Sequence, residues 1–287
     1  MTFGIIGNLE KQGLKEAVRT LIALLQRSGM EFYLEEELEA RCGLEGRSPR
    51  ASKEECVTRA DMVVALGGDG TILSVARLVG TRQIPILGVN LGKLGFLAEV
   101  SPDDMEKAIG EILARQFIIE DRLVLEASHP GGQDHITYAV NDLVIARSRS
   151  LRIIDVATYI DGAYAVTYRG DGLIVSTPTG STAYALSNGG PIVIPTTKVI
   201  GITPISPHTL SGRPLVIPDN AVIRVQIHSH QQEVLFSADG QTEEYLATPA
   251  ELEIRKARHS LRLVRRMGRS YFDVLRAKLF WGQDART

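Results

Sequence analysis

The sequence predicts a two-domain protein, in which an α/β domain with a parallel sheet is followed by a β-rich domain. Up to about residue 117, short apolar runs alternate with stretches of helical periodicity, as in a parallel sheet covered by helices. Beyond that point most apolar runs are typical of strands separated by turn residues. The chain has 287 residues, of which 44% are hydrophobic, so it can bury two cores.

The first domain, residues 1–117, is expected to begin with a buried strand over 3–7. A helix is predicted over 12–28, where Leu, Val and Ile recur at helical spacing. The stretch 32–40 is interpreted as a strand and an acidic loop. A second buried strand is predicted over 62–68, where the apolar run is unbroken.

The same domain continues with a predicted helix over 71–79, a third apolar strand over 84–90 and a helix over 103–115. A Ser-Pro start signal at 101–102 precedes the last helix. Because helices separate these short apolar strands, we expect the strands to run parallel in one sheet.

The second domain, residues 118–266, is expected to consist mainly of strands. Asp-Gly pairs at 161–162 and 239–240 suit the tight turns of β-hairpins, and one short helix is expected near Ser181. The final segment, 267–287, is expected to form a helix that docks on the first domain. The predicted apolar face of this helix contains Phe272, Leu275 and Leu279.

Composition argues against several classes of partner. The formal net charge of −2 gives no reason to expect a nucleic-acid or anionic-membrane partner. No apolar run approaches the roughly 20 residues that a membrane span needs. Cys42 and Cys56 lie far apart without metal-ligand spacing, so a reducing, cytoplasmic setting is expected. His228 and His230 lack a third ligand signal, and no protein metal site is expected.

The stretch LGGDGTIL places a carboxylate, Asp69, inside a glycine-rich turn between a predicted strand and a predicted helix. A Walker A loop would need a Lys before its hydroxyl residue, but Thr71 follows Gly70 directly. A G-x-G-x-x-G dinucleotide fingerprint fails because its third position is Leu73. What remains is a turn at a helix start, whose backbone N–H groups suit phosphate.

Asp69 has three candidate roles at such a turn. It could cap the helix or order the turn, or help to hold a cation through water. It could also accept a proton from a hydroxyl that attacks phosphorus, which would place base and phosphate side by side. The loop by itself does not decide, because it also resembles the loop of phosphofructokinases and diacylglycerol-type lipid kinases.

Three further segments carry polar or aromatic candidates. In NLGKLGFL, Phe96 is either core or a face for a flat apolar ring. Asn141 and Asp142 interrupt a predicted strand, which is costly if they are buried and unpaired. They either form a bulge with local hydrogen bonds or hold vicinal ribose hydroxyls. The stretch 169–191 gathers hydroxyl residues at a short helix start beside the aromatic Tyr184, which is typical of a nucleotide site.

Together, LGGDGT, NLGKLGFLAEV, the Asn-acid pair at 141–142 and DGLIVSTPTGSTAYALSNGGPIV resemble the NAD kinase family, in the family's order and spacing over nearly the whole chain. The last segment is the most specific, because phosphofructokinases and lipid kinases do not share it. Two positions depart from the family pattern: Asn188 stands where Ala is usual, and Ile194 stands where His is frequent.

The resemblance implies a Rossmann-like parallel sheet in the first domain of a two-domain NAD kinase-like fold. It implies phosphoryl transfer from ATP, or in some members polyphosphate, to the 2′-hydroxyl of the adenosine ribose of NAD, giving NADP. A divalent cation such as Mg²⁺ and a homodimer or homotetramer are implied as well. The family's catalytic acid falls on Asp69. Its dinucleotide-binding residues fall on Asp69, Gly70, Phe96, Asn141, Asp142, Arg152, Arg169, Asp171, Thr182, Ala183, Tyr184, Ala185, Leu186, Ser187 and Gln241.

Two other functions stay open. The first is a lipid or sugar kinase with the same glycine-rich loop, against which the ribose-type residues argue. The second is a dinucleotide sensor without turnover, against which the retained Asp69 argues.

Overall fold

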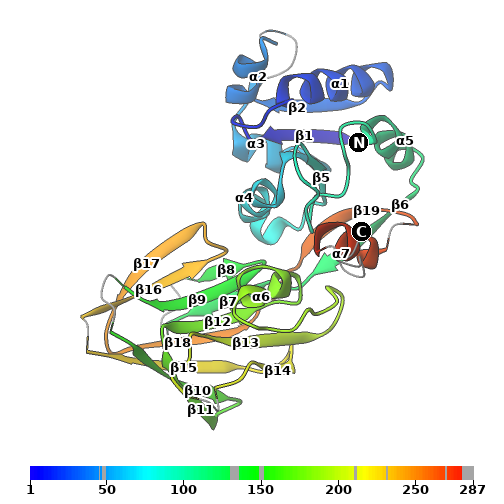
Figure 1. Cartoon of the computed structure of the whole chain (residues 1–287). Coiled ribbons are helices and arrows are strands. Elements are labelled where there is room, and N and C mark those ends of the chain that lie inside the picture. The colour runs from blue at the N-terminus through cyan, green and yellow to red at the C-terminus, as the bar shows by residue number, and fades with distance from the viewer. Residues whose placement is uncertain are drawn as a thin grey trace. The chain divides into compact units, whose positions relative to one another are not determined.

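A computed structural model describes residues 1–44, 46, 50–129, 136–148, 152–209, 212–230, 232–268 and 270–279. The chain divides into two compact units. The first joins Met1–Asp121 to the segment from Leu261 onward, and the second is Arg122–Ser260. Each unit has its own strands and sheets (Figure 1). Each also has its own apolar core.

The first unit contains a seven-stranded sheet with the order β3-β2-β1-β4-β5-β19-β6. Adjacent strands from β3 to β19 pair in parallel, so the α/β fold predicted for this part is confirmed. The strands are β1 (Thr2–Gly7), β2 (Glu31–Glu35), β3 (Arg50–Ala51), β4 (Met62–Gly67), β5 (Ile86–Asn90), β6 (Phe117–Arg122) and β19 (Leu261–Arg266).

Strand β19 joins the sheet of the first unit, whereas sequence periodicity placed residues 261–266 with the β-rich domain. A strand pattern does not reveal which sheet the strand enters. Arg265 forms an ion pair with Glu99, and Arg266 Nε lies 2.8 Å from Glu111 Oε2. These pairs bind β19 to the segment after β5 and to the last helix before β6.

Seven helices occur in the described part of the chain: α1 (Leu14–Arg27), α2 (Glu36–Cys42), α3 (Lys53–Thr58), α4 (Asp69–Val79), α5 (Met105–Leu113), α6 (Tyr184–Ser187) and α7 (Tyr271–Leu279). Short 3₁₀ turns η1 (Gly80–Arg82) and η2 (Thr179–Thr182) accompany them. Judged by the described ranges, no helix combines the length and apolarity needed to cross a bilayer.

Two helices differ from the sequence expectation. Helix α2 replaces the predicted acidic loop, because glutamate is a good helix former and Leu38 and Cys42 bury one face. Helix α3 was not predicted. It begins with a capping box, in which Ser52 Oγ accepts from Glu55 N–H and Glu55 Oε2 accepts from Ser52 N–H.

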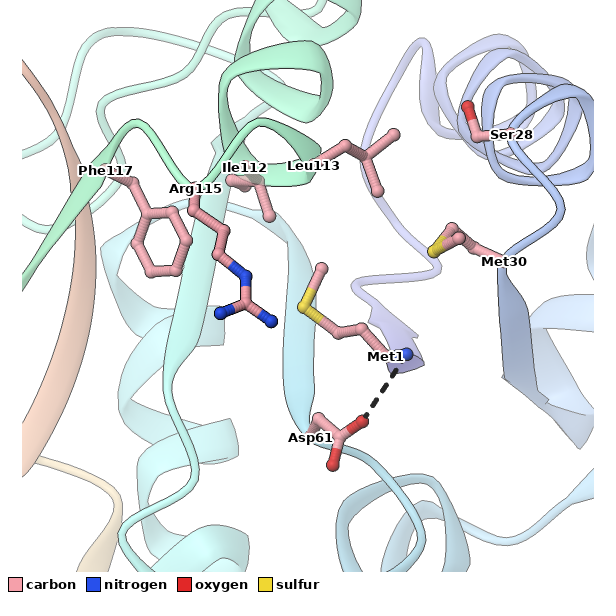
Figure 2. A pocket seen from close by; sticks show the side chains of 8 residues that line it. All are labelled: Met1, Ser28, Met30, Asp61, Ile112, Leu113, Arg115 and Phe117. Atoms are coloured by element: carbon pink, nitrogen blue, oxygen red, sulfur yellow. Dashed lines mark ion pairs between the residues drawn. The ribbon is translucent and has the colours of Figure 1, made fainter.

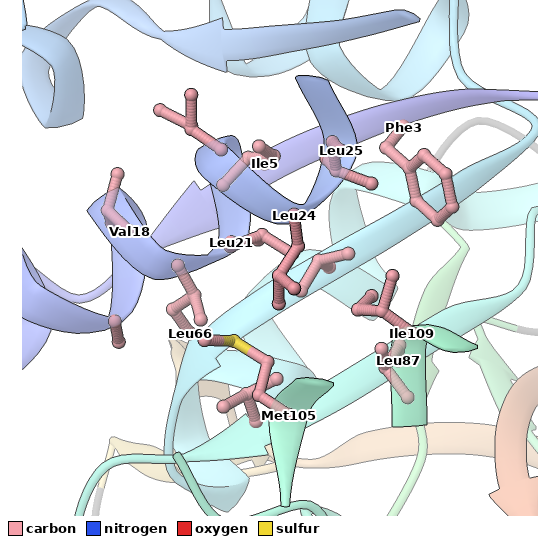
Figure 3. Close-up of a cluster of buried hydrophobic side chains, with 14 of the residues drawn as sticks. Phe3, Ile5, Val18, Leu21, Leu24, Leu25, Leu66, Leu87, Met105 and Ile109 are labelled. Atoms are coloured by element: carbon pink, nitrogen blue, oxygen red, sulfur yellow. The ribbon is translucent and has the colours of Figure 1, made fainter. Parts of the chain in front are cut away.

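One core cluster of the first unit lies on one face of the parallel sheet. Helices α1, α2 and α5 supply side chains that meet alternate residues of β1, β4 and β5. Figure 3 shows this cluster, in which Leu21 and Leu25 of α1 and Ile109 of α5 gather around the strands. The core therefore fixes the strands whose carboxyl ends carry the glycine-rich loop.

Helix α7 belongs to the first unit, but of its predicted apolar face only Leu275 is buried. Val274 and Leu275 are buried against Phe96. Phe272 is 45% exposed and Leu279 is 36% exposed. The helix is short and its sequence offers two overlapping apolar stripes, so spacing alone could not select the stripe that packs.

The second unit is a pair of six-stranded antiparallel sheets, with orders β11-β10-β15-β18-β7-β8 and β14-β13-β12-β9-β16-β17. Its core draws on both sheets, so the predicted β-rich fold is confirmed. The strands are β7 (Leu125–Ser128), β8 (Thr137–Ala139), β9 (Asp142–Arg147), β10 (Ile154–Ile160), β11 (Ala163–Gly170), β12 (Gly172–Ser176), β13 (Val199–Ile205), β14 (Leu215–Pro218), β15 (Ile223–Ser229), β16 (Glu233–Ala238), β17 (Thr242–Ala247) and β18 (Ala250–Lys256).

Both predicted hairpin turns are present. Asp161 and Gly162 connect β10 to β11, and Asp239 and Gly240 lie between β16 and β17. All four residues have positive φ angles, as tight hairpin turns with right-handed twist require.

Replacing Leu21 with Ala is expected to lower the free energy of unfolding by about 2–5 kcal/mol, because this fully buried side chain lies at the centre of the first core. Chemical denaturation of the purified variant measures the change. Met267→Ala serves as a control in the same unit, because Met267 is 64% exposed and its loss should change stability by less than about 0.5 kcal/mol. Equal effects of the two substitutions would contradict this assignment of the core.

Candidate active site

The strand order of the first unit creates a crevice at the carboxyl ends of two strands. From β1 the chain moves outward to β2 and β3 and then returns to place β4 on the other side of β1. Ligands of open parallel sheets bind at such a switch point. A hollow of about 320 Å³ occurs there. Its lining includes Asn8, Lys53, Gly70, Thr71 and Ser74.

A second pocket, of about 740 Å³, lies at the opposite end of the strands of the same sheet. Figure 2 shows the residues that line it. It is lined by residues at the amino ends of strands, including Met1, Met30 and Asp61. The six-residue strand β4 spans about 20 Å between its two ends. The pocket therefore lies far from the glycine-rich loop and does not contribute to the candidate site.

The glycine-rich loop is shaped by close contacts around Thr71. A Cβ at Gly67 would lie 2.1 Å from Thr71 Oγ1, so only glycine fits there. Gly68 is the N-cap of α4, and its N–H lies 3.4 Å from Thr71 Oγ1. The predicted start of this helix at Thr71 is therefore two residues late, because Asp69 is already helical. A carboxylate in this first turn interacts favourably with the helix dipole.

The carboxylate of Asp69 is held by backbone N–H groups of the loop after β5. Phe96 N–H donates to Oδ2 at 2.8 Å, while Leu97 and Ala98 N–H donate to Oδ1 at 3.0 and 3.2 Å. A Cβ at Gly95 would lie 2.0 Å from Asp69 Oδ1, so glycine is required for this approach. The two glycine-bearing motifs are thus parts of one structure, in which Asp69 joins two adjacent strand ends.

A lysine of the C-terminal helix completes this environment. Lys278 Nζ lies 3.4 Å from Asp69 Oδ2 and 4.3 Å from the centre of the Phe96 ring. Phe96 itself is buried among Val274 and Leu275. The ring proposed for ligand stacking is therefore covered by α7, while its backbone N–H holds Asp69.

In the second unit, Asp239 organises the turn that contains Asn141 and Asp142. Its carboxylate accepts hydrogen bonds from the backbone N–H groups of Val140 at 2.9 Å, Asn141 at 2.7 Å and Asp142 at 3.1 Å. Asp239 has φ 55°, a conformation that Asp tolerates better than most residues. The polar interruption of the predicted strand is therefore stabilised by a buried internal partner.

The hydroxyl-rich segment after β12 packs against the same turn. Thr177 Oγ1 donates to Val140 O at 2.6 Å and accepts from Gly180 N–H at 3.0 Å. A Cβ at Gly180 would lie 2.0 Å from Asn141 O. These contacts bring the Asn141–Asp142 turn beside η2 and α6.

The predicted residues of η2 and α6 have different surroundings. Thr182 Oγ1 donates to Thr179 O at 3.2 Å, and Ala185 is buried against Ile174 and Ile205. Tyr184 is 45% exposed and offers an aromatic face. The remaining candidates of this segment are Ala183, Leu186 and Ser187, which lie at the junction of η2 and α6 or within α6.

Asp142 is buried, with 4% of its surface exposed. Burial is the main cause that raises the pKa of its carboxyl group to about 7, and the charge of Asp239 raises the pKa further. A backbone hydrogen bond from Tyr184 opposes this rise. Burial also raises the pKa of Asp239, against the effect of its three backbone hydrogen bonds. The charge of Asp142 is therefore expected to change near neutral pH.

Asp171 directly precedes β12, and Arg169 lies near the end of β11. Asp171 Oδ1 pairs with Arg147 Nε at 2.8 Å, and Arg169 makes a bidentate ion pair with Asp155 at 2.8 and 3.0 Å. The five-residue strand β12 separates Asp171 from Thr177 by about 20 Å. Of the other candidates, Arg152 is exposed before β10, while Gln241 follows the turn at Asp239 and Gly240.

Sequence reasoning missed two residues of these environments. Asp239 was interpreted only as a turn residue, although an acid at a positive-φ position beside polar motifs was a usable signal. Lys278 was not a candidate, because nothing near it in the sequence links it to Asp69. The described residues contain no cluster of three or more potential metal ligands.

Comparison with known proteins identifies the relatives of this chain. A family model described as the ATP-NAD kinase N-terminal domain matches residues 3–117, and one described as the ATP-NAD kinase C-terminal domain matches residues 140–266. The NAD kinase of Bacteroides fragilis is 41% identical over all of both chains. That of Geobacter sulfurreducens is 44% identical over 92% of each.

Two solved structures have the same fold. Yeast NADH kinase complexed with NADH matches with a TM-score of 0.90 and 27% identity, covering 100% of this chain and 89% of that chain. An NAD kinase from Archaeoglobus fulgidus in complex with ATP matches with a TM-score of 0.77 and 27% identity, covering 96% and 99%. With both domain families and full-length relatives matched, this chain belongs to the NAD kinase family.

Proposed function

We propose that Asp69 receives the 2′-hydroxyl of the adenosine ribose during the phosphorylation of NAD to NADP. The observation that carries this proposal is the fixed carboxylate, which three backbone N–H groups hold beside the glycine-rich loop. Asp69 therefore aligns the hydroxyl for attack and takes its proton as the bond to phosphorus forms.

Asn141 and Asp142 are proposed to hold ribose hydroxyls of the dinucleotide. Their backbone is fixed by Asp239, so the side chains stand on a rigid turn. An ionised carboxylate accepts from two vicinal hydroxyls at once, and the exposed ring of Tyr184 is suited to stacking. The other residues proposed for dinucleotide binding are Gly70, Phe96, Arg152, Arg169, Asp171, Thr182, Ala183, Ala185, Leu186, Ser187 and Gln241.

The phosphoryl donor is proposed to be ATP, with its phosphates in the hollow beside Gly70 and Thr71. The position at the sheet's switch point and at the start of α4 supports this, since both features favour phosphate. Mg²⁺ is the proposed cation. Because the described residues offer no cage of ligands, donor phosphates would supply most of its coordination. When bound, the cation neutralises phosphate charge.

A cytoplasmic homodimer or homotetramer is proposed as the working form. Cys42 and Cys56 are buried free thiols, as expected in a reducing compartment. Leu215 and Val216 on edge strand β14, with exposed fractions of 38% and 43%, provide an apolar edge that self-association would cover.

Asp69→Asn should lower the kcat of NADP formation from NAD and MgATP by about 10²–10⁴-fold, because an amide cannot take the hydroxyl proton. NAD affinity, measured by calorimetry, should change less than about threefold, since most contacts remain. Asp103→Asn, an exposed change in the same unit, should retain wild-type turnover. Full activity in the Asp69 variant would rule out the proposed acid role.

NAD binding should weaken as pH falls below about 7, because the pKa of Asp142 is raised to about 7 and only its ionised form accepts from both hydroxyls. The affinity should approach a tenfold loss per pH unit on the acidic side and level off above pH 8. Calorimetry between pH 5.5 and 8.5 measures this dependence.

Asp142→Asn should give weaker binding with a flatter pH profile, because the titrating group is gone. Glu244→Gln on the exposed surface of β17 should preserve the wild-type profile. If NAD affinity in Asp142→Asn kept the wild-type pH dependence, the titrating group would be a different one.

A further inference from the structure

All the acceptor positions of the Asp69 carboxylate are occupied in this structure. A carboxylate offers about four lone-pair sites. Oδ1 accepts from Leu97 and Ala98 N–H, while Oδ2 accepts from Phe96 N–H and Lys278 Nζ. A substrate hydroxyl can therefore donate to Asp69 only where one of these partners withdraws.

Lys278 is the partner that can withdraw at least cost. Its contact with Oδ2 is 3.4 Å long, whereas the backbone contacts measure 2.8–3.2 Å. The backbone donors belong to a loop held between β5 and the bridge at Val100. The Lys278 side chain is 34% exposed, and its four-carbon stem is flexible. Replacement of Lys278 by a substrate hydroxyl at Oδ2 thus requires only a side-chain movement, and the loop keeps its conformation.

The position of Lys278 follows from the packing of α7. Val274 and Leu275 are buried against Phe96, and residues three and four positions further along a helix share their face. The apolar contact that docks α7 consequently directs Lys278 toward Asp69. The ring of Phe96, 4.3 Å below the ammonium group, adds a cation–π attraction.

We propose that Lys278 is a second catalytic side chain: it holds the acceptor position on Asp69 until the ribose hydroxyl arrives, and its displaced ammonium group then binds the phosphoryl group in transfer. The proposal rests on the proposed role of Asp69. In the step, the hydroxyl oxygen forms the new bond to phosphorus, the bond from phosphorus to the leaving phosphate breaks, and Asp69 takes the proton. Lys278 stays protonated throughout.

The chemistry of the loop supports this assignment. Phosphoryl transfer depends on cations that neutralise charge on the equatorial oxygens, and the loop from Gly67 to Thr71 contains no lysine. Lys53 lines the nearby hollow, but it pairs with the buried carboxylate of Glu35 at 3.1 Å. Lys278 instead pairs with a carboxylate that three N–H groups already stabilise, so its charge is more readily redirected.

Steady-state kinetics of Lys278→Met and Lys278→Arg tests the proposal. Met keeps the length and apolar stem but removes the charge, so kcat should fall by about 10–10³-fold. The KM for NAD should stay within about threefold or decrease, because a competitor for Asp69 is removed. Arg keeps the charge and should recover at least about tenfold of the lost kcat. Arg276→Gln is the matched control, since Arg276 is exposed on the same helix and pairs with Asp273.

Each outcome has a distinct meaning. A wild-type kcat in Lys278→Met would overturn the proposal, and so would an Arg variant as slow as the Met variant with an unchanged melting temperature. A fall in kcat that is matched by loss of NAD binding and by early melting in both variants would show a role in docking α7 only. Absence of NADP formation by the wild-type chain would instead contradict the proposed reaction itself.

Discussion

The hydrogen bonds between Asp69 and the backbone of Phe96, Leu97 and Ala98 are the constraint on which the rest of the candidate site depends. They join the loop after β4 to the loop after β5. Gly95 must lack a side chain to permit them. The same loop positions the Phe96 ring against which α7 packs. A single carboxylate thereby sets the geometry of three segments.

The second unit uses the same device at a different place. Asp239 binds three consecutive N–H groups, and Gly180 permits the close approach of the next segment. In both units an acid satisfies backbone donors that an irregular loop leaves unpaired. In each unit a side-chain carboxylate therefore fixes the backbone beside a proposed binding residue. A backbone fixed in this way favours a reaction that depends mainly on positioning.

Much of the fold was predictable because apolar residues recur in the sequence with the period of the helix or strand whose face they bury. The strands β1, β4 and β5 follow from unbroken apolar runs, and the hairpin turns follow from Asp-Gly pairs. Helix α2 was not predicted, because the apolar stripe in its mostly acidic sequence is short. The sheet partner of β19 could not be predicted, because strand periodicity identifies a strand without identifying its neighbour.

The residues of the candidate site were likewise predictable only in part. Glycine-rich and polar motifs marked Asp69, Asn141 and Asp142, since such residues are costly inside apolar runs without a partner. Their partners were harder to find. Asp239 is 98 positions from Asn141, and Lys278 is 209 positions from Asp69, so only the folded chain reveals these contacts.

The most direct test of the account is a crystal structure of the chain with NAD, Mg²⁺ and a non-hydrolysable ATP analogue. We expect the 2′-hydroxyl oxygen within hydrogen-bond distance of Asp69 Oδ2, with the three backbone contacts of Asp69 retained. A complex in which that hydroxyl binds another group, while Asp69 keeps only its present partners, would contradict the central role given to this carboxylate.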